Sequence, residues 1–122
     1  MSDEFLKVAR QEIQMEIDSL KQVFAKCGND EELYNKSKDI ERHMHKIKGL
    51  APMMGQNNVG EIARISDIIL KHVLNHGVLK SSHDIILEAV KRMDSLFSEK
   101  ETDEIDSFKK RVIDTYPDIT GF

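Results

Sequence analysis

The sequence predicts an all-α protein: an up-down-up-down four-helix bundle with an additional C-terminal helix. Three observations favour this fold class. Apolar residues recur every three or four positions through most of the chain, which is the period of an amphipathic helix. Only two Pro and six Gly occur among the 122 residues, so long helices can run without interruption. Alternating apolar and polar runs bounded by regular turn signals, which are typical of strands, do not occur in the sequence.

The first helix is expected from Asp3 to Ala25. The apolar pattern then breaks around Gly28, and either Asn29 or Asp30 could cap a second helix. The apolar positions of the first helix are Leu6, Ala9, Ile13, Ile17, Leu20 and Phe24.

The second helix carries one apolar stripe and is expected to end near Gly55. Pro52 has no backbone N–H, and its ring clashes with the preceding turn, so it should kink or end this helix near Lys48. The stripe consists of Leu33, Ile40, Met44, Ile47 and Ala51.

A third helix is expected from about Asn58 to Asn75, with Gly77 as its stop. Ser81 and Asp84 have the spacing of a capping box that would open a fourth helix. The apolar positions in phase are Ile62, Ile65, Ile69 and Val73 in the third helix, and Ile86, Val90, Met93 and Phe97 in the fourth.

A shorter fifth helix is expected from about Asp103 to Tyr116, just before Pro117, with Ile105, Phe108 and Val112 on its apolar side. Short connections between long amphipathic helices favour antiparallel neighbours, hence the up-down-up-down order. We therefore expect one helical-bundle domain over residues 1–117 and a frayed tail over residues 118–122.

Composition and charge exclude several classes of protein. The chain is long enough for one domain with its own core and too short for two. Lys and Arg number 18 against 22 Asp and Glu, a formal net charge of −4, which argues against nucleic acid or an anionic membrane as a partner. A single Cys cannot form an internal disulfide, and no apolar run is long enough to span a bilayer. We expect a monomer located in the cytoplasm.

The segment around His45 is the one that suggests a chemistry. At about 100° per residue, His45 lies roughly 120° from the centre of the apolar stripe and therefore points toward solvent. Lys48 and Gly49 follow one turn later, where they neighbour His45 on the helix surface. A mid-helix Gly costs about 1 kcal/mol relative to Ala, so it needs a reason, and one reason is room for a bulky group. An accessible imidazole, a nearby cation and cleared space suit the acceptance of a phosphoryl group.

These residues carry a resemblance to a known family. His45, Lys48, Gly49 and Gly55 match the His-x-x-Lys-Gly-x-x-x-x-x-Gly pattern of histidine phosphotransfer domains. The chain most resembles the N-terminal phosphotransfer domain of chemotaxis-type (CheA-like) histidine kinases, over residues 3–97 and with a matching fifth helix. The resemblance implies that His45 carries a phosphoryl group, with Lys48 compensating its charge and Gly49 leaving space for it.

The resemblance also implies the partners. A histidine kinase catalytic domain would supply the phosphoryl group, and the aspartate of a response-regulator receiver domain would take it. The chain has no Gly-rich phosphate loop, so it is a phosphoryl carrier without an ATP site, at most a domain of a histidine kinase. No carboxylate cluster suits Mg²⁺, which the partner should therefore provide, and we expect no cofactor or metal in this chain.

In the same family a carboxylate of the third helix hydrogen-bonds the phosphorylatable imidazole, and Asp67 falls at the matching position. Asp67 lies at the edge of a narrow polar strip, from which it could accept a hydrogen bond from Nδ1 of His45. That bond would fix the tautomer and leave the Nε2 lone pair free for attack. The alternative interpretation is a solvated Asp on an exposed helix face.

The sequence departs from the family in three ways. Bulky residues follow the Lys-Gly pair where the family has small ones, Arg64 stands where the subgroup commonly has His, and Asp67 is shorter than the usual Glu. Met53, about 160° from the apolar stripe, is expected to be exposed and to help select the receiver. The bulky segment comprises Leu50, Ala51, Pro52, Met53 and Met54.

Two other functions remain open. A helical adaptor could bind a kinase or receiver without chemistry, which the bulky segment after Gly49 would favour. A metal-binding bundle could use His72 and His76, whose i, i+4 spacing can hold a metal, although partly buried, hydrogen-bonded histidines are the commoner outcome. His43 lacks Lys and Gly at the right spacing and is expected to be an ordinary surface or boundary residue.

Overall fold

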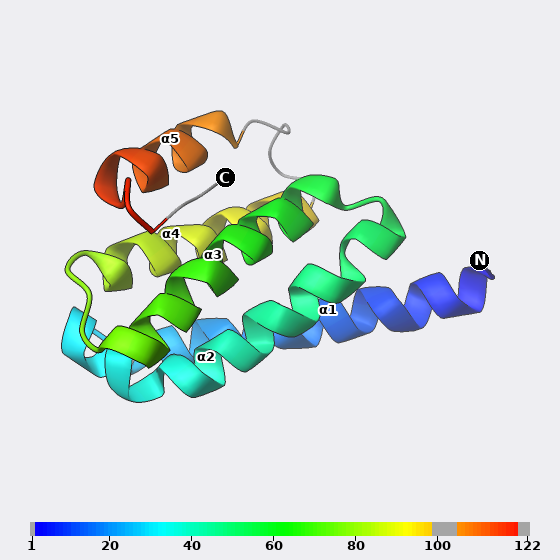
Figure 1. The fold of residues 1–122 in the computed structure, drawn as a ribbon. Helices are drawn as coiled ribbons and strands as arrows, with labels where there is room; N and C mark the ends of the chain where they lie inside the picture. The colour runs from blue at the N-terminus through cyan, green and yellow to red at the C-terminus, as the bar shows by residue number, and fades with distance from the viewer. Residues whose placement is uncertain (1, 99–104, 120–122) are drawn as a thin grey trace.

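The computed structural model describes residues 2–98 and 105–119, and all regular structure in these ranges is helical (Figure 1). The predicted all-α class is confirmed. Five α-helices and one 3₁₀ turn follow in the order α1 (Asp3–Ala25), α2 (Asp30–Leu50), η1 (Pro52–Met54), α3 (Asn57–His76), α4 (Ser82–Phe97) and α5 (Asp106–Thr115).

The helices form a bundle-like arrangement, with α5 on the outside of α4 (Figure 1). The most extensive contact joins α2 to α3, while α1 packs on α2 and α4. An ion pair joins α5 to α4, because Glu88 of α4 binds Arg111 of α5 as well as Arg92 of its own helix. Among the described residues, no helix combines the length and apolar character that crossing a bilayer requires.

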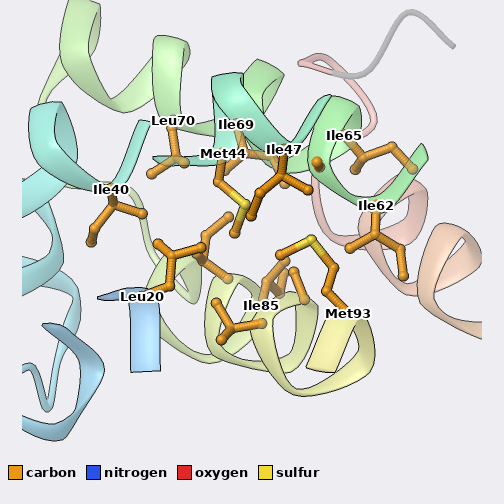
Figure 2. Close-up of a cluster of buried hydrophobic side chains, with 14 of the residues drawn as sticks. Leu20, Ile40, Met44, Ile47, Ile62, Ile65, Ile69, Leu70, Ile85 and Met93 are labelled. Atoms are coloured by element: carbon orange, nitrogen blue, oxygen red, sulfur yellow. The ribbon is translucent and has the colours of Figure 1, made fainter. Parts of the chain in front are cut away.

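The core is built from the apolar stripes that the sequence indicated. Every in-phase position named for the five helices is buried except Leu6, which is half-buried near the N-terminal end of α1. Figure 2 shows Leu20, Met44, Ile47 and Ile69 meeting in the middle of this cluster. Burial of one such side chain stabilises the fold by roughly 1.5–3 kcal/mol, so these stripes supply the main driving force for helix packing.

The end of α2 is shaped by Pro52. Pro52 has no N–H to donate to the Lys48 carbonyl, and the α-helix ends at Leu50, close to the predicted point. The chain continues as the 3₁₀ turn η1, which ends at Met54. The next residue, Gly55, has a φ of 75°, in the left-handed region that favours glycine. The connection thus turns sharply from α2 into α3.

The start of α4 corrects a prediction. Ser81 adopts a left-handed φ of 70°, and its side chain makes no capping bond, so the expected Ser81–Asp84 capping box is wrong. The N–H groups of Ser81 and His83 instead donate to the carboxylate of Asp30, at 2.9 and 2.8 Å. Asp30 is free for this role because Asn29 caps α2, accepting a 2.8 Å hydrogen bond from the Glu32 N–H. A residue distant in the sequence therefore closes the end of α4.

The C-terminal helix is shorter than predicted within the described residues. Its expected start near Asp103 lies outside them, and α5 ends at Thr115. Tyr116 is buried and donates a 2.7 Å hydrogen bond to the Lys80 carbonyl. Ile119, expected to fray, packs partly buried against the core, while residues 120–122 of the expected tail lie outside the described ranges.

Two helical glycines provide a matched test of this packing. A Cβ on Gly60 would lie 2.9 Å from Cγ and 3.0 Å from Cδ of Pro52, whose ring cannot move aside easily, whereas a Cβ on Gly49 meets nothing within 4 Å. Gly60→Ala should lower the free energy of unfolding by about 1–3 kcal/mol. Gly49→Ala should raise it by roughly 0.5–1 kcal/mol, because Ala is the better helix former. Urea denaturation of both variants measures this, and a Gly60→Ala variant as stable as wild type would contradict the close approach.

Candidate functional site

His45 stands on the solvent side of α2, as its phase predicted, with 60% of its side chain exposed. Its Nδ1 atom faces α3, where it lies 3.6 Å from Oδ2 of Asp67. It also lies 3.9 Å from Oε2 of Glu41, one turn earlier on α2. The imidazole therefore turns its Nδ1 edge to two carboxylates.

Asp67 is a buried carboxylate between α2 and α3. Its side chain is only 2% exposed, so the alternative of a solvated surface Asp is wrong. Its Oδ2 atom accepts hydrogen bonds of 2.9 Å from the ammonium groups of Lys48 on α2 and Lys71 on α3. The two lysines neutralise a charge that would otherwise be costly to bury.

The electrostatics of the two carboxylates differ. Burial alone would raise the pKa of Asp67, but hydrogen bonds with Glu41, Lys48 and Lys71 outweigh it and lower the pKa from 3.8 to about 2. The pKa of Glu41 is raised above its ordinary value, first by its hydrogen bond with Asp67 and then by burial. Asp67 is therefore the carboxylate that stays ionised, and Glu41 is the one that takes up a proton more readily.

His45 and Asp67 face each other as predicted, but they are too far apart for the predicted hydrogen bond. At 3.6 Å the Nδ1 to Oδ2 distance exceeds a hydrogen bond, so the expected bond is not formed in this state. Lys48, the cation that neighbours His45 on α2, donates a hydrogen bond to Asp67. Catalytic hydrogen bonds are often long without substrate and shorten when the reacting group arrives.

The surface beside His45 is open at Gly49, where an added Cβ would have no atom within 4 Å. Met53, in η1, is 47% exposed, in agreement with its phase. Leu50 and Met54 are half-buried and pack against the core. Of the large apolar side chains in the bulky segment after Gly49, Met53 is therefore the one most exposed to solvent.

His43 belongs to a different cluster, between α1 and α2. Its side chain is 13% exposed, and its Nδ1 lies 2.7 Å from Oε2 of Glu16, whose other oxygen is 3.1 Å from Nζ of Lys46. Burial would raise the pKa of Glu16, but the bonds from His43 and Lys46 together lower it. This buried cluster ties the two helices together and leaves His43 less accessible than His45.

Within the described residues, His72 and His76 belong to no group of three potential metal ligands. The rings of His72 and His76 pack at 4.3 Å between centroids on the surface of α3. In the described parts of the chain, the one group offering three potential ligand atoms within 4.8 Å of each other is Glu41, His45 and Asp67. Because the two ammonium groups on Asp67 already compensate the negative charge there, we assign no metal to it.

Sequence reasoning did not identify two members of this site. Glu41 lies at i−4 from His45 and Lys71 at i+4 from Asp67, spacings that place side chains on the same helix surface. That spacing is the signal that could have found them, once His45 and Asp67 were chosen.

Comparison with known proteins does not identify a relative: no family model, curated protein or solved structure matches the chain. The interpretation of the site depends on its geometry and on the motif around His45. The structure brings together five residues, which are Glu41, His45, Lys48, Asp67 and Lys71.

The lowered pKa of Asp67 predicts a pH-dependent stability. Its stabilising contribution is present above its ordinary pKa of 3.8 and is lost as the pH falls toward about 2. Asp67→Asn should lower the free energy of unfolding by about 1–3 kcal/mol at pH 7, and the difference from wild type should shrink between pH 4 and pH 2. Urea denaturation at several pH values measures this, with the exposed Asp18→Asn as the matched control. A difference that does not depend on pH would contradict the ionised, lysine-bound Asp67.

Proposed function

We propose that this chain is a histidine phosphotransfer module of a two-component system. In this proposal, His45 accepts a phosphoryl group on Nε2 and passes it to the aspartate of a response-regulator receiver domain. The observation that carries the proposal is the placement of His45, an exposed imidazole whose Nδ1 edge faces buried Asp67 while its Nε2 edge is left to solvent and partners. Lys48 and the open surface at Gly49 adjoin it.

The chemistry follows from the two edges of the ring. A carboxylate facing Nδ1 favours the tautomer with its proton there, which leaves the lone pair on Nε2. When Nε2 attacks the phosphorus of a phosphorylated partner, the Nε2–P bond forms, the bond from phosphorus to the donor atom breaks, and the donor leaves with that electron pair. The ring keeps its Nδ1 proton and becomes cationic, so Asp67 then stabilises it, and the reverse step delivers the group to an aspartate.

The two lysines on Asp67 support a specific role for Lys48. Both ammonium groups bind the same oxygen of Asp67 at 2.9 Å. If Lys48 turns toward a dianionic phosphoryl group on His45, Lys71 remains to neutralise Asp67. The buried carboxylate therefore does not lose all of its compensation during transfer.

The expected partners and chain order belong to the same proposal. The sequence has no nucleotide-binding loop. In this proposal the phosphoryl group therefore comes from a histidine kinase catalytic domain, and Mg²⁺ comes with the receiver. The short connections at residues 26–29 and 77–81 support an up-down-up-down order of α1 to α4. A cytoplasmic location and a monomeric state are part of this proposal as well.

A second candidate is a helical adaptor that binds a kinase or receiver without chemistry. The exposed side chain of Met53 favours it, because flexible apolar bulk at the surface after Gly49 suits docking. The absence of a formed hydrogen bond between His45 and Asp67 is also compatible with it. The two candidates differ in whether a covalent phosphoryl group is ever found on the chain.

Substitution of the acceptor separates these candidates. His45→Gln should abolish phosphoryl uptake and leave the helical content unchanged, because the exposed ring contributes little packing. The chain is incubated with an acetyl-phosphate-charged receiver, and its intact mass is measured. His76→Gln is the matched exposed control and should retain uptake, as should His43→Gln, with some loss of stability because His43 binds Glu16. Receiver binding by wild type without any gain in mass would support the adaptor instead.

Removal of the neighbouring cation should slow transfer. A partly screened attraction between Lys48 and a phosphoryl group is of order 1 kcal/mol at a solvated site, so Lys48→Ala should reduce the uptake rate by several-fold to about tenfold. The measurement is a time course of uptake at low ionic strength, with the exposed Lys91→Ala as control. An unchanged rate for Lys48→Ala would remove this residue from the mechanism.

A further inference from the structure

Glu41 lies beside the acceptor and belongs to no part of the phosphotransfer motif. It precedes His45 by one turn of α2, its side chain is 20% exposed, and its Oε2 lies 3.9 Å from Nδ1 of His45. Asp67 reaches the same Nδ1 from α3, at 3.6 Å. The acceptor edge that must hold a proton is therefore flanked by two carboxylates from two helices.

One oxygen of Asp67 has no hydrogen-bond partner. Lys48 and Lys71 both bind Oδ2, whereas Oδ1 is buried and unpartnered. A buried carboxylate oxygen without a donor costs free energy, so a proton held nearby would be stabilised there. Glu41 and His45 are the nearby groups that can carry a proton, since one ligand atom of each lies within 4.8 Å of a carboxylate oxygen of Asp67, and for His45 that oxygen is Oδ2 at 3.6 Å.

We propose that Glu41 is a positioning residue for the phosphoacceptor, a second carboxylate that together with Asp67 holds the Nδ1 proton of His45. The ionised Glu41 accepts from Nδ1–H and keeps the Nε2 lone pair directed to solvent. The protonated Glu41 instead donates to Asp67 and withdraws both carboxylates from the ring. This role rests on the proposed function, because only a phosphoacceptor needs Nε2 kept free.

The charges around Glu41 are compatible with this role. His45 faces Glu41 along α2, and Asp67 and Lys71 face it from α3. Glu41 also lines a shallow hollow on the surface of α2, together with Lys38. The hydrogen bond with Asp67, burial and the Asp67 charge raise the pKa of Glu41, and the charge of Lys71 opposes them. Glu41 therefore exchanges its proton more readily than Asp67, which the two lysines keep ionised.

The second carboxylate matters most after transfer. Formation of the Nε2–P bond, with loss of the donor's bond to phosphorus, leaves the ring cationic with its Nδ1 proton in place. Two carboxylates at 3.6 and 3.9 Å in the unphosphorylated state can then both stabilise that cation. Asp67 alone offers less, because its Oδ2 is shared with two ammonium groups.

The tautomer of His45 provides a test that does not need phosphorylation. Long-range ¹H–¹⁵N spectra of the histidine-labelled full chain at pH 8 give the ratio of the Nδ1–H to the Nε2–H form. Glu41→Gln should reduce this ratio at His45 by roughly threefold, as expected for loss of one charge near 4 Å in a solvated site. Glu88→Gln, a partly exposed ion-paired glutamate on α4, is the control and should leave the ratio unchanged. An equal ratio in Glu41→Gln and wild type would overturn the proposal.

Phosphoryl uptake from the charged receiver completes the test. Glu41→Gln should slow uptake about threefold or more with little change in melting temperature, while Glu88→Gln should keep the wild-type rate. Normal uptake by Glu41→Gln would overturn the role of Glu41 and leave the proposed function standing. No uptake by the wild-type chain would overturn the proposed function itself, whatever the tautomer ratio shows.

Discussion

The buried carboxylate of Asp67 is the constraint on which the arrangement of the site depends. A negative charge inside the contact between α2 and α3 has to be neutralised, and one lysine from each helix reaches the same oxygen. The pair of Lys48 with Asp67 joins α2 to α3, in the relative rotation that the packing of the core sets. The side chains one turn away on α2 therefore come to lie against α3, which turns the Nδ1 edge of His45 inward and leaves the opposite edge of the ring outward.

Both ends of the bundle are closed by contacts between different structural elements. At one end, the Pro52 ring packs on Gly60, which has no side chain to hold it away. At the other end, the Asp30 carboxylate accepts hydrogen bonds from backbone groups at the start of α4. The Glu16 and His43 pair adds a buried polar link between α1 and α2. These contacts limit the freedom of α2, the helix that carries His45.

Under the proposed function, this site contributes a nucleophile and local charge compensation, and the remaining catalytic groups come from a partner. The exposed ring and the open surface at Gly49 are compatible with close approach by another protein. Met53 stands at the edge of that approach and offers apolar contact. The lysine pair on Asp67 and the proposed role of Glu41 both concern the side of the ring that a partner does not reach.

The helices, their apolar faces and the outward position of His45 could all be predicted from the amino-acid sequence alone. These features depend on local periodicity and on breakers such as Pro52 and Gly77, so the chain pattern is enough to predict them. The resemblance to phosphotransfer domains, rather than the motif itself, indicated Asp67 as the carboxylate near His45. Three features depend on tertiary packing and could not be predicted from the sequence: Asp67 is buried, Lys48 is bound to it, and Glu41 faces Nδ1 of His45.

The cap of α4 likewise depends on tertiary packing, which a local sequence pattern does not contain. The local spacing of Ser81 and Asp84 predicted a capping box, whereas Asp30 performs the capping from the start of another helix. A short-range sequence pattern contains no information about which distant carboxylate lies at a helix end in the folded protein. Relative rotation and approach of helices are set by the packing of the whole core, and for that reason they became known only from the structure.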